Sequence, residues 1–163
     1  MTRGVGVALA ALACLAAADV TRAGAEDAPS AIPLFLKASI STAGPYGEGW
    51  YLTLAPDGEV SLQVFYSNNP SGSLLARFNL SQERVLAIRK ACDTQEFFEL
   101  PSELTPLQRQ FHRPNLGLEI HLGGRHHRVS LYDPAALEGR TTTARFLTVW
   151  KSVFEGLPLK PSW

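Results

Sequence analysis

The sequence predicts a single α+β domain, with an antiparallel sheet of about five to six strands and two amphipathic helices packed on one face of that sheet. Two hairpin patterns, in which apolar and polar residues alternate on both sides of a turn, predict most of the strands. Two segments with apolar residues at helical spacing predict the helices. We expect the domain to span residues 32–158, in the order strands, helix, hairpin, helix, with a short tail at 159–163.

The N-terminal segment has the features of a secretory signal peptide. Arg3 precedes an apolar run from Val5 to Ala18, and small residues follow it. The run is shorter than the roughly 20 residues that a membrane-spanning helix needs. We therefore expect a signal peptide at 1–25, a short flexible segment at 26–31, no transmembrane helix after signal removal, and a periplasmic or secreted protein. A lipid anchor at Cys14, which follows Ala-Leu-Ala, is the less favoured alternative.

The hydrophobic content, net charge and cysteine count indicate which class of protein to expect. The 163 residues are 45% hydrophobic and carry no net formal charge, so one domain with a substantial core is expected and nucleic acid is not an expected partner. Once the signal is removed, Cys92 is the only cysteine left, which rules out an internal disulfide. We expect a monomer whose stability comes from packing.

The segment from Trp50 to Val64 predicts a hairpin around Pro56-Asp57-Gly58. A two-residue loop would mix apolar and polar side chains on both faces. A three-residue loop closed by Gly58 instead pairs Leu54 with Val60 and separates the two kinds of side chain. The buried face would then carry Trp50, Leu52, Leu54, Val60, Leu62 and Val64.

Further elements flank this hairpin. Alternation predicts a strand at 34–40, and a second strand at 73–79 follows a turn cluster at 67–72. Ser81 is a typical N-cap for a helix at about 82–93. A second helix is expected at about 142–155. Their inner faces would carry Val85, Ile88 and Cys92 in the first helix, and Phe146, Val149, Trp150 and Val153 in the second.

Residues 116–132 repeat the hairpin pattern around Gly123-Gly124, and three of the four histidines lie close to this turn. If Leu118 pairs with Val129 and Leu116 with Leu131 across the turn, His121 lies opposite His126 on the polar face. His127 falls on the apolar face, where we expect its nitrogen to reach solvent. The three imidazoles therefore cannot meet at one ion without breaking the register.

A metal site from two of these histidines remains a hypothesis. His121 and His126 would stand about 5 Å apart, and Glu119 can add an oxygen ligand for zinc or copper. Arg128, however, lies opposite Glu119 and is expected to neutralise it as a cross-strand ion pair. A solvated polar face without metal is the favoured interpretation, so no cofactor is expected.

The segment 101–114 has no clean periodicity and is the expected place for specificity, because loops of this length are usually functional or disordered. The alternative is a solvated connector whose Phe111 and Leu107 pack against the core. The residues that would contact a partner combine an aromatic side chain with hydrogen-bond donors. They are Arg109, Phe111, His112 and Arg113.

No nucleophile elbow, phosphate-binding glycine loop, zinc-protease helix or paired-cysteine motif occurs in the chain, so an enzyme is not favoured. The predicted function is a non-catalytic, exported binding module that contacts a protein or a component of the cell envelope. The first alternative is a weak transition-metal-binding protein that uses the histidine pair. The second is a hydrolase-type enzyme without a recognisable motif.

The chain also resembles an uncharacterised domain family of small exported bacterial proteins and lipoproteins, over roughly residues 32–156. The resemblance implies the α+β fold and export, and it implies no activity because the family has none assigned. The matching residues are Tyr51-Leu52-Thr53-Leu54 with Asp57-Gly58 and Val60, then Phe97-Phe98-Glu99-Leu100, then Gly123-Gly124.

Overall fold

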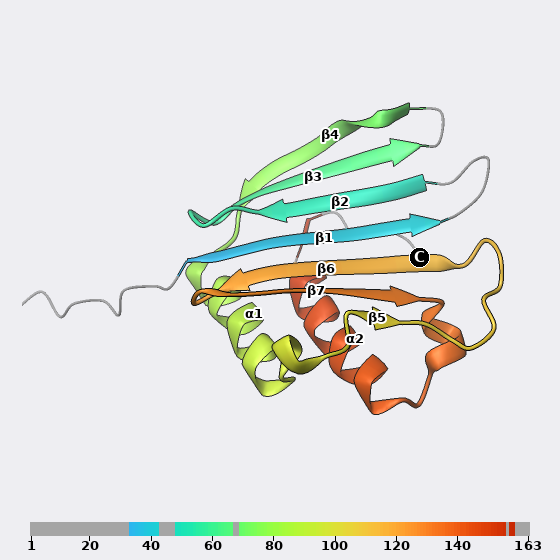
Figure 1. Cartoon of the computed structure of the whole chain (residues 1–163). Coiled ribbons are helices and arrows are strands. Elements are labelled where there is room, and N and C mark those ends of the chain that lie inside the picture. The colour runs from blue at the N-terminus through green and yellow to red at the C-terminus, as the bar shows by residue number, and fades with distance from the viewer. Residues whose placement is uncertain (1–32, 43–47, 67–68, 156, 159–163) are drawn as a thin grey trace, which may run out of the picture. The chain divides into compact units, whose positions relative to one another are not determined.

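The computed structural model describes residues 33–42, 48–66, 69–155 and 157–158, which form an α+β fold built on one seven-stranded sheet (Figure 1). The strand order is β4-β3-β2-β1-β6-β7-β5, and all neighbouring strands are antiparallel except β5 and β7. The strands are β1 (Leu34–Thr42), β2 (Glu48–Leu54), β3 (Glu59–Tyr66), β4 (Asn69–Asn79), β5 (Glu103–Leu104), β6 (Pro114–Leu122) and β7 (Arg125–Tyr132). The helices are α1 (Gln82–Thr94) and α2 (Thr141–Phe154), with short 3-10 turns η1 (Phe97–Glu99) and η2 (Pro134–Leu137).

The predicted signal peptide, the segment at 26–31 and the tail at 159–163 lie outside the described residues. Among the described helices, none has the length and apolar composition that crossing a membrane requires.

The β2–β3 hairpin has the predicted three-residue loop. Leu54 is paired with Val60, and the Ala55 N–H donates to the Glu59 carbonyl over 2.8 Å, which closes the loop. Gly58 adopts a φ of 90°, a conformation that costs a residue with a Cβ more than it costs glycine. The predicted register of this hairpin is therefore confirmed.

The predicted number of strands is too low. The missed strand β5 lies in the segment 101–114 and has only two residues, too few to show alternation. It is a strand because the folded chain brings it beside β7, which is distant from it in the sequence. β4 begins at Asn69 rather than at 73, so the predicted turn cluster is partly strand. Pro70 is tolerated there because β4 is an edge strand, in which one row of N–H groups has no neighbour to bond.

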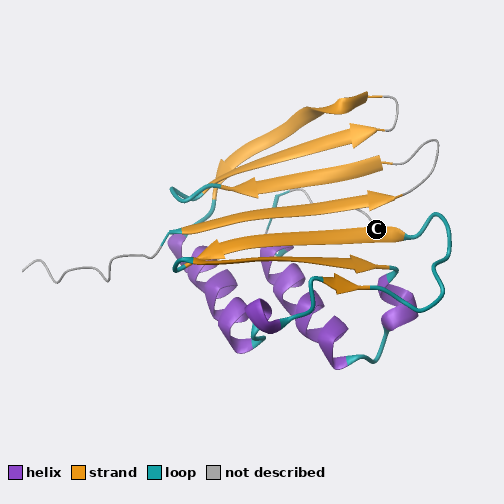
Figure 2. Cartoon of the chain, viewed as in Figure 1, coloured by secondary structure: helices purple, strands orange, loops and turns teal. Residues whose placement is uncertain are grey.

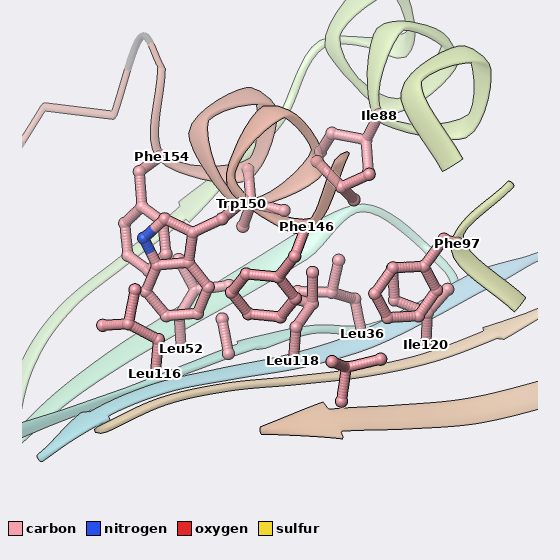
Figure 3. Close-up of a cluster of buried hydrophobic side chains, with 14 of the residues drawn as sticks. Leu36, Leu52, Ile88, Phe97, Leu116, Leu118, Ile120, Phe146, Trp150 and Phe154 are labelled. Carbon is pink, nitrogen blue, oxygen red and sulfur yellow. The ribbon is translucent and has the colours of Figure 1, made fainter. Parts of the chain in front are cut away.

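Both helices lie on the same side of the sheet (Figure 2). Their buried residues join the inward-facing residues of the strands in one apolar cluster. Figure 3 shows Phe146 and Trp150 of α2 facing Leu116 and Leu118 of the sheet, with Phe97 over Ile120. All six side chains are at most 1% exposed, and burial of each large apolar side chain contributes about 1.5–3 kcal/mol.

Two arginines join the helices at opposite ends, which shows that the helices run antiparallel. Arg84 at the start of α1 donates to the Ser152 carbonyl near the end of α2 over 3.0 Å. Arg145 near the start of α2 donates to the Gln95 carbonyl after α1 over 2.7 Å. Ser81 caps α1 as predicted, since its hydroxyl accepts from the Arg84 N–H. Each helix boundary lies within one residue of its prediction.

Candidate metal centre

The β6–β7 hairpin turns at Gly123-Gly124 in the predicted register, with Leu118 opposite Val129 and His121 opposite His126. Residues of β6 alternate between buried and partly exposed from Leu116 to Leu122. The buried set packs against the helices, so the alternate set lies on the opposite, outer face of the sheet. This outer face carries Glu119, His121 and His126.

These three side chains form what we call the His–Glu cluster. The Glu119 Oε1 atom lies 3.1 Å from His121 Nε2 and 3.4 Å from His126 Nε2. The two imidazole rings stack, with centroids 4.0 Å apart and an angle of 25° between their planes. One potential ligand atom from each residue lies within 4.8 Å of the other two. Three donors of the kind that transition metals prefer therefore lie close together on the outer face of the sheet.

The spacing of the donors suits a tetrahedral ion. Zinc binds histidine nitrogen and carboxylate oxygen at roughly 2.0–2.2 Å, so two ligand atoms of a tetrahedral site stand about 3.3 Å apart. The two oxygen–nitrogen distances in the cluster, 3.1 and 3.4 Å, already match this value. Potential ligand nitrogens of the two imidazoles lie within 4.8 Å of each other, and the stacked rings must turn so that both lone pairs point at one ion. Both side chains are about half exposed, His121 at 43% and His126 at 55%, which leaves room for that movement.

Strand β1 supplies two neighbours that sequence reasoning did not place at the cluster. Phe35 pairs with His121 in the sheet, and its ring contacts the imidazole edge-on at a centroid distance of 5.2 Å. Lys37 pairs with Glu119, and its Nζ lies 3.9 Å from Oε1. The alternation of β1 puts both residues on its polar face, but only the sheet order brings β1 beside β6.

The electrostatics favour an ionised carboxylate at the centre of the cluster. The hydrogen bond with His121 is the main cause that lowers the pKa of Glu119 below its usual value, and the charge of Lys37 adds to it. The predicted ion pair with Arg128 is wrong. Arg128 does lie opposite Glu119 in the register, but among the described residues the carboxylate pairs with Lys37, His121 and His126 instead. These three groups lie within 3.9 Å of the carboxylate oxygen, whereas Arg128 does not come within ion-pair distance of it.

His127 is on the opposite face, as predicted, and cannot join the cluster. Its Nε2 atom lies 2.7 Å from the Leu100 carbonyl oxygen, and its ring meets Phe97 edge-on at 5.8 Å. Nε2 therefore bonds the chain after α1 rather than solvent, while the side chain as a whole stays partly exposed. His127 holds η1 against the sheet.

The two arginines of the predicted contact loop attach the loop to the domain rather than point away from it. Arg113 Nε lies 3.6 Å from a carboxylate oxygen of Asp133, whose side chain is 4% exposed. Arg109 lies over the Tyr132 ring, at 5.6 Å from the ring centroid. Arg109 and Arg113 therefore contribute to the position of the loop.

The apolar residues of the same loop project into solvent. Phe111 is 90% exposed and Leu107 is 100% exposed, so the alternative in which they pack against the core is wrong. His112 is also exposed and has a φ of 62°. The loop therefore presents two nearly fully exposed apolar side chains, and the contact role of Arg109, Phe111, His112 and Arg113 stays a prediction.

No protein-family model matches this chain, and a search of curated proteins finds no match to it. The resemblance to a family of exported bacterial proteins stays a prediction.

Proposed function

We propose that the protein is an exported binding protein whose ligand is a divalent transition metal, Zn²⁺ or Cu²⁺, held by Glu119, His121 and His126. The observation that carries the proposal is the convergence of three donor atoms from two strands, with two of their three separations close to those of a tetrahedral site. Export rests on the signal-like order of the N-terminal sequence.

The donor set decides which metals fit. Imidazole nitrogen suits zinc, copper, iron and nickel, whereas magnesium and calcium prefer sites made of oxygen alone. Closed structural zinc sites bind with roughly 10–16 kcal/mol. With three partly exposed donors instead of four, we expect a weaker free energy of about 8 kcal/mol, which corresponds to a dissociation constant on the order of 1 μM.

Calorimetric titration of Zn²⁺ into the untagged chain tests the proposal. Because each donor contributes directly to coordination, His121→Ala, His126→Ala and Glu119→Gln should each weaken binding by roughly tenfold or more. His112→Ala is the matched control, since it removes an exposed histidine outside the cluster, and it should bind as the wild type does.

Two results would reject the metal site. The first is wild-type binding with less than one Zn²⁺ per chain at saturation. The second is equal affinity of the wild type and the three cluster variants, which would show that zinc binds elsewhere.

A second candidate function, contact with a protein or envelope component, is favoured by a different observation. Leu107 and Phe111 stand almost fully exposed on a loop whose arginines attach it to the domain. Apolar side chains presented in this way are typical of interaction sites. The energy of such a contact would come from burying the two side chains, about 1.5–3 kcal/mol each.

Capture from an envelope fraction tests this second candidate. The wild type is compared with a variant that carries Leu107→Ser and Phe111→Ser, and with Leu86→Ser, which alters a half-exposed leucine on α1. A partner of the loop should be lost with the double variant and kept with the control. If all three chains capture the same proteins in equal amounts, the loop is not a contact surface.

A further inference from the structure

A small hollow adjoins the His–Glu cluster on the outer face of the sheet. Its volume is about 140 Å³, and Glu119 belongs both to its wall and to the cluster. Its other polar lining residues come from three strands, β1, β2 and β7. The lining includes Lys37, Ser39, Tyr51, Gly117, Glu119 and Arg128.

Gly117 leaves room for this hollow. It pairs with Ser39 in the sheet, and a Cβ at position 117 would lie 2.6 Å from the Ser39 Oγ atom. Any larger residue would push the hydroxyl away. The pairing of glycine with serine therefore leaves the Ser39 hydroxyl in the wall of the hollow, next to its sheet partner Tyr51.

Two cations flank the carboxylate that the hollow shares with the cluster. Glu119 pairs with Lys37 of β1 on one side and with Arg128 of β7 on the other. Lys37 lies 3.9 Å from the carboxylate, and Arg128 has no ion pair or hydrogen bond with any residue that the structure describes. The three side chains together carry one net positive charge.

Metal binding would change this balance. A divalent ion coordinated by Glu119 neutralises the carboxylate that now pairs with Lys37. The net charge of Glu119, Lys37, Arg128 and the ion is then three positive, compared with one positive without the ion. Zinc held by three protein ligands also keeps a fourth coordination position open. An anion bound in the hollow would neutralise part of this positive charge and fill the fourth coordination position of the metal.

We propose that the His–Glu cluster and this hollow act together as a site for a small oxyanion, which binds the metal through one oxygen and Lys37 and Arg128 through the others. The inference rests on the proposed metal site and deepens it by naming the class of the second ligand. The hollow is smaller than the roughly 300–1,000 Å³ of pockets that enclose drug-sized molecules. It therefore matches a small anion such as sulfate, phosphate or a short carboxylate.

Zinc affinity in different anions tests the inference. Zn²⁺ is titrated into the untagged chain in chloride, sulfate and acetate buffers of equal ionic strength. Because metal and anion would bind next to each other, each should raise the affinity for the other by the same factor, here about fivefold. A gain in sulfate indicates a tetrahedral oxyanion as the ligand, and a gain in acetate alone indicates a carboxylate.

Variants separate this inference from the metal site itself. Arg128→Gln should bind zinc in chloride at least as tightly as the wild type, because a neighbouring positive charge is gone, and it should lose the gain in sulfate or acetate. Arg77→Gln is the matched control. Arg77 is on β4, where it pairs with Ser61 of β3. Because β4 is five strand spacings from β7, Arg77 lies roughly 24 Å from the strand that carries Arg128. This control should keep the gain.

The outcomes are distinct. Zinc binding in chloride with no gain in either anion, or a gain that Arg128→Gln retains, overturns the oxyanion site and leaves the metal site standing. Failure of the wild type to bind zinc in any of the three buffers overturns both.

Discussion

Replacing Trp150 tests how the core on the helical side of the sheet is held together. Trp150 is 1% exposed, and its ring lies 4.6 Å from that of Phe154 and 6.0 Å from that of Phe146. Its Nε1 atom is buried and has no hydrogen-bond partner among the described residues. The indole therefore contributes through its apolar area while its N–H group opposes folding.

Two substitutions separate these contributions. Trp150→Ala removes the ring and should lower the free energy of unfolding by about 3–5 kcal/mol. Trp150→Phe leaves a small cavity that costs about 1 kcal/mol. It also removes an unpaired buried donor, whose desolvation costs about 1–3 kcal/mol in the wild type. The phenylalanine variant should therefore be as stable as the wild type, or up to about 2 kcal/mol more stable.

Urea unfolding followed by far-ultraviolet circular dichroism measures the difference. Tryptophan fluorescence is unsuitable because the substitution removes a fluorophore. A Trp150→Phe variant that loses as much stability as Trp150→Ala would refute the reasoning, since it would show that the indole nitrogen makes a stabilising hydrogen bond in the folded protein.

Three further predictions concern the described domain. Burial raises the pKa of Cys92 to about 12, so in a Cys14→Ala chain iodoacetamide should modify the thiol only as fast as the domain unfolds, and rapid modification of the native protein would contradict this. Gly49→Ala should displace the Phe65 ring, which a Cβ there overlaps, and weaken its contact with Tyr51 at a cost of about 0.5–1.5 kcal/mol, and equal urea midpoints would count against that overlap. His127→Phe should cost about 1–3 kcal/mol, because it leaves the carbonyl at the end of η1 without its donor, and an unchanged melting curve would show that water replaces the imidazole.

Much of the candidate site could be predicted from the sequence, because its three ligands lie on one hairpin. Side chains of a strand alternate between two faces, so the turn at Gly123-Gly124 decides that His121 faces His126 and that His127 does not. The same rule predicted the first hairpin around Gly58. Both inferences use only residues that are close together in the sequence.

The partners of Glu119 could not be predicted in this way. Arg128 is its neighbour in the hairpin, yet the nearest cation is Lys37, which is more than 80 positions away in the chain. The two-residue strand β5 was missed for a related reason, since its pairing with β7 leaves no local pattern.

By itself, the sequence determined which side chains of each hairpin face the core and which face water, because alternation and turn geometry are local properties of the backbone. Only the tertiary structure decided that β1 lies beside β6, which brings Phe35 and Lys37 to the His–Glu cluster. Strand order depends on how whole elements pack into one common core, and no short segment of the chain encodes that arrangement.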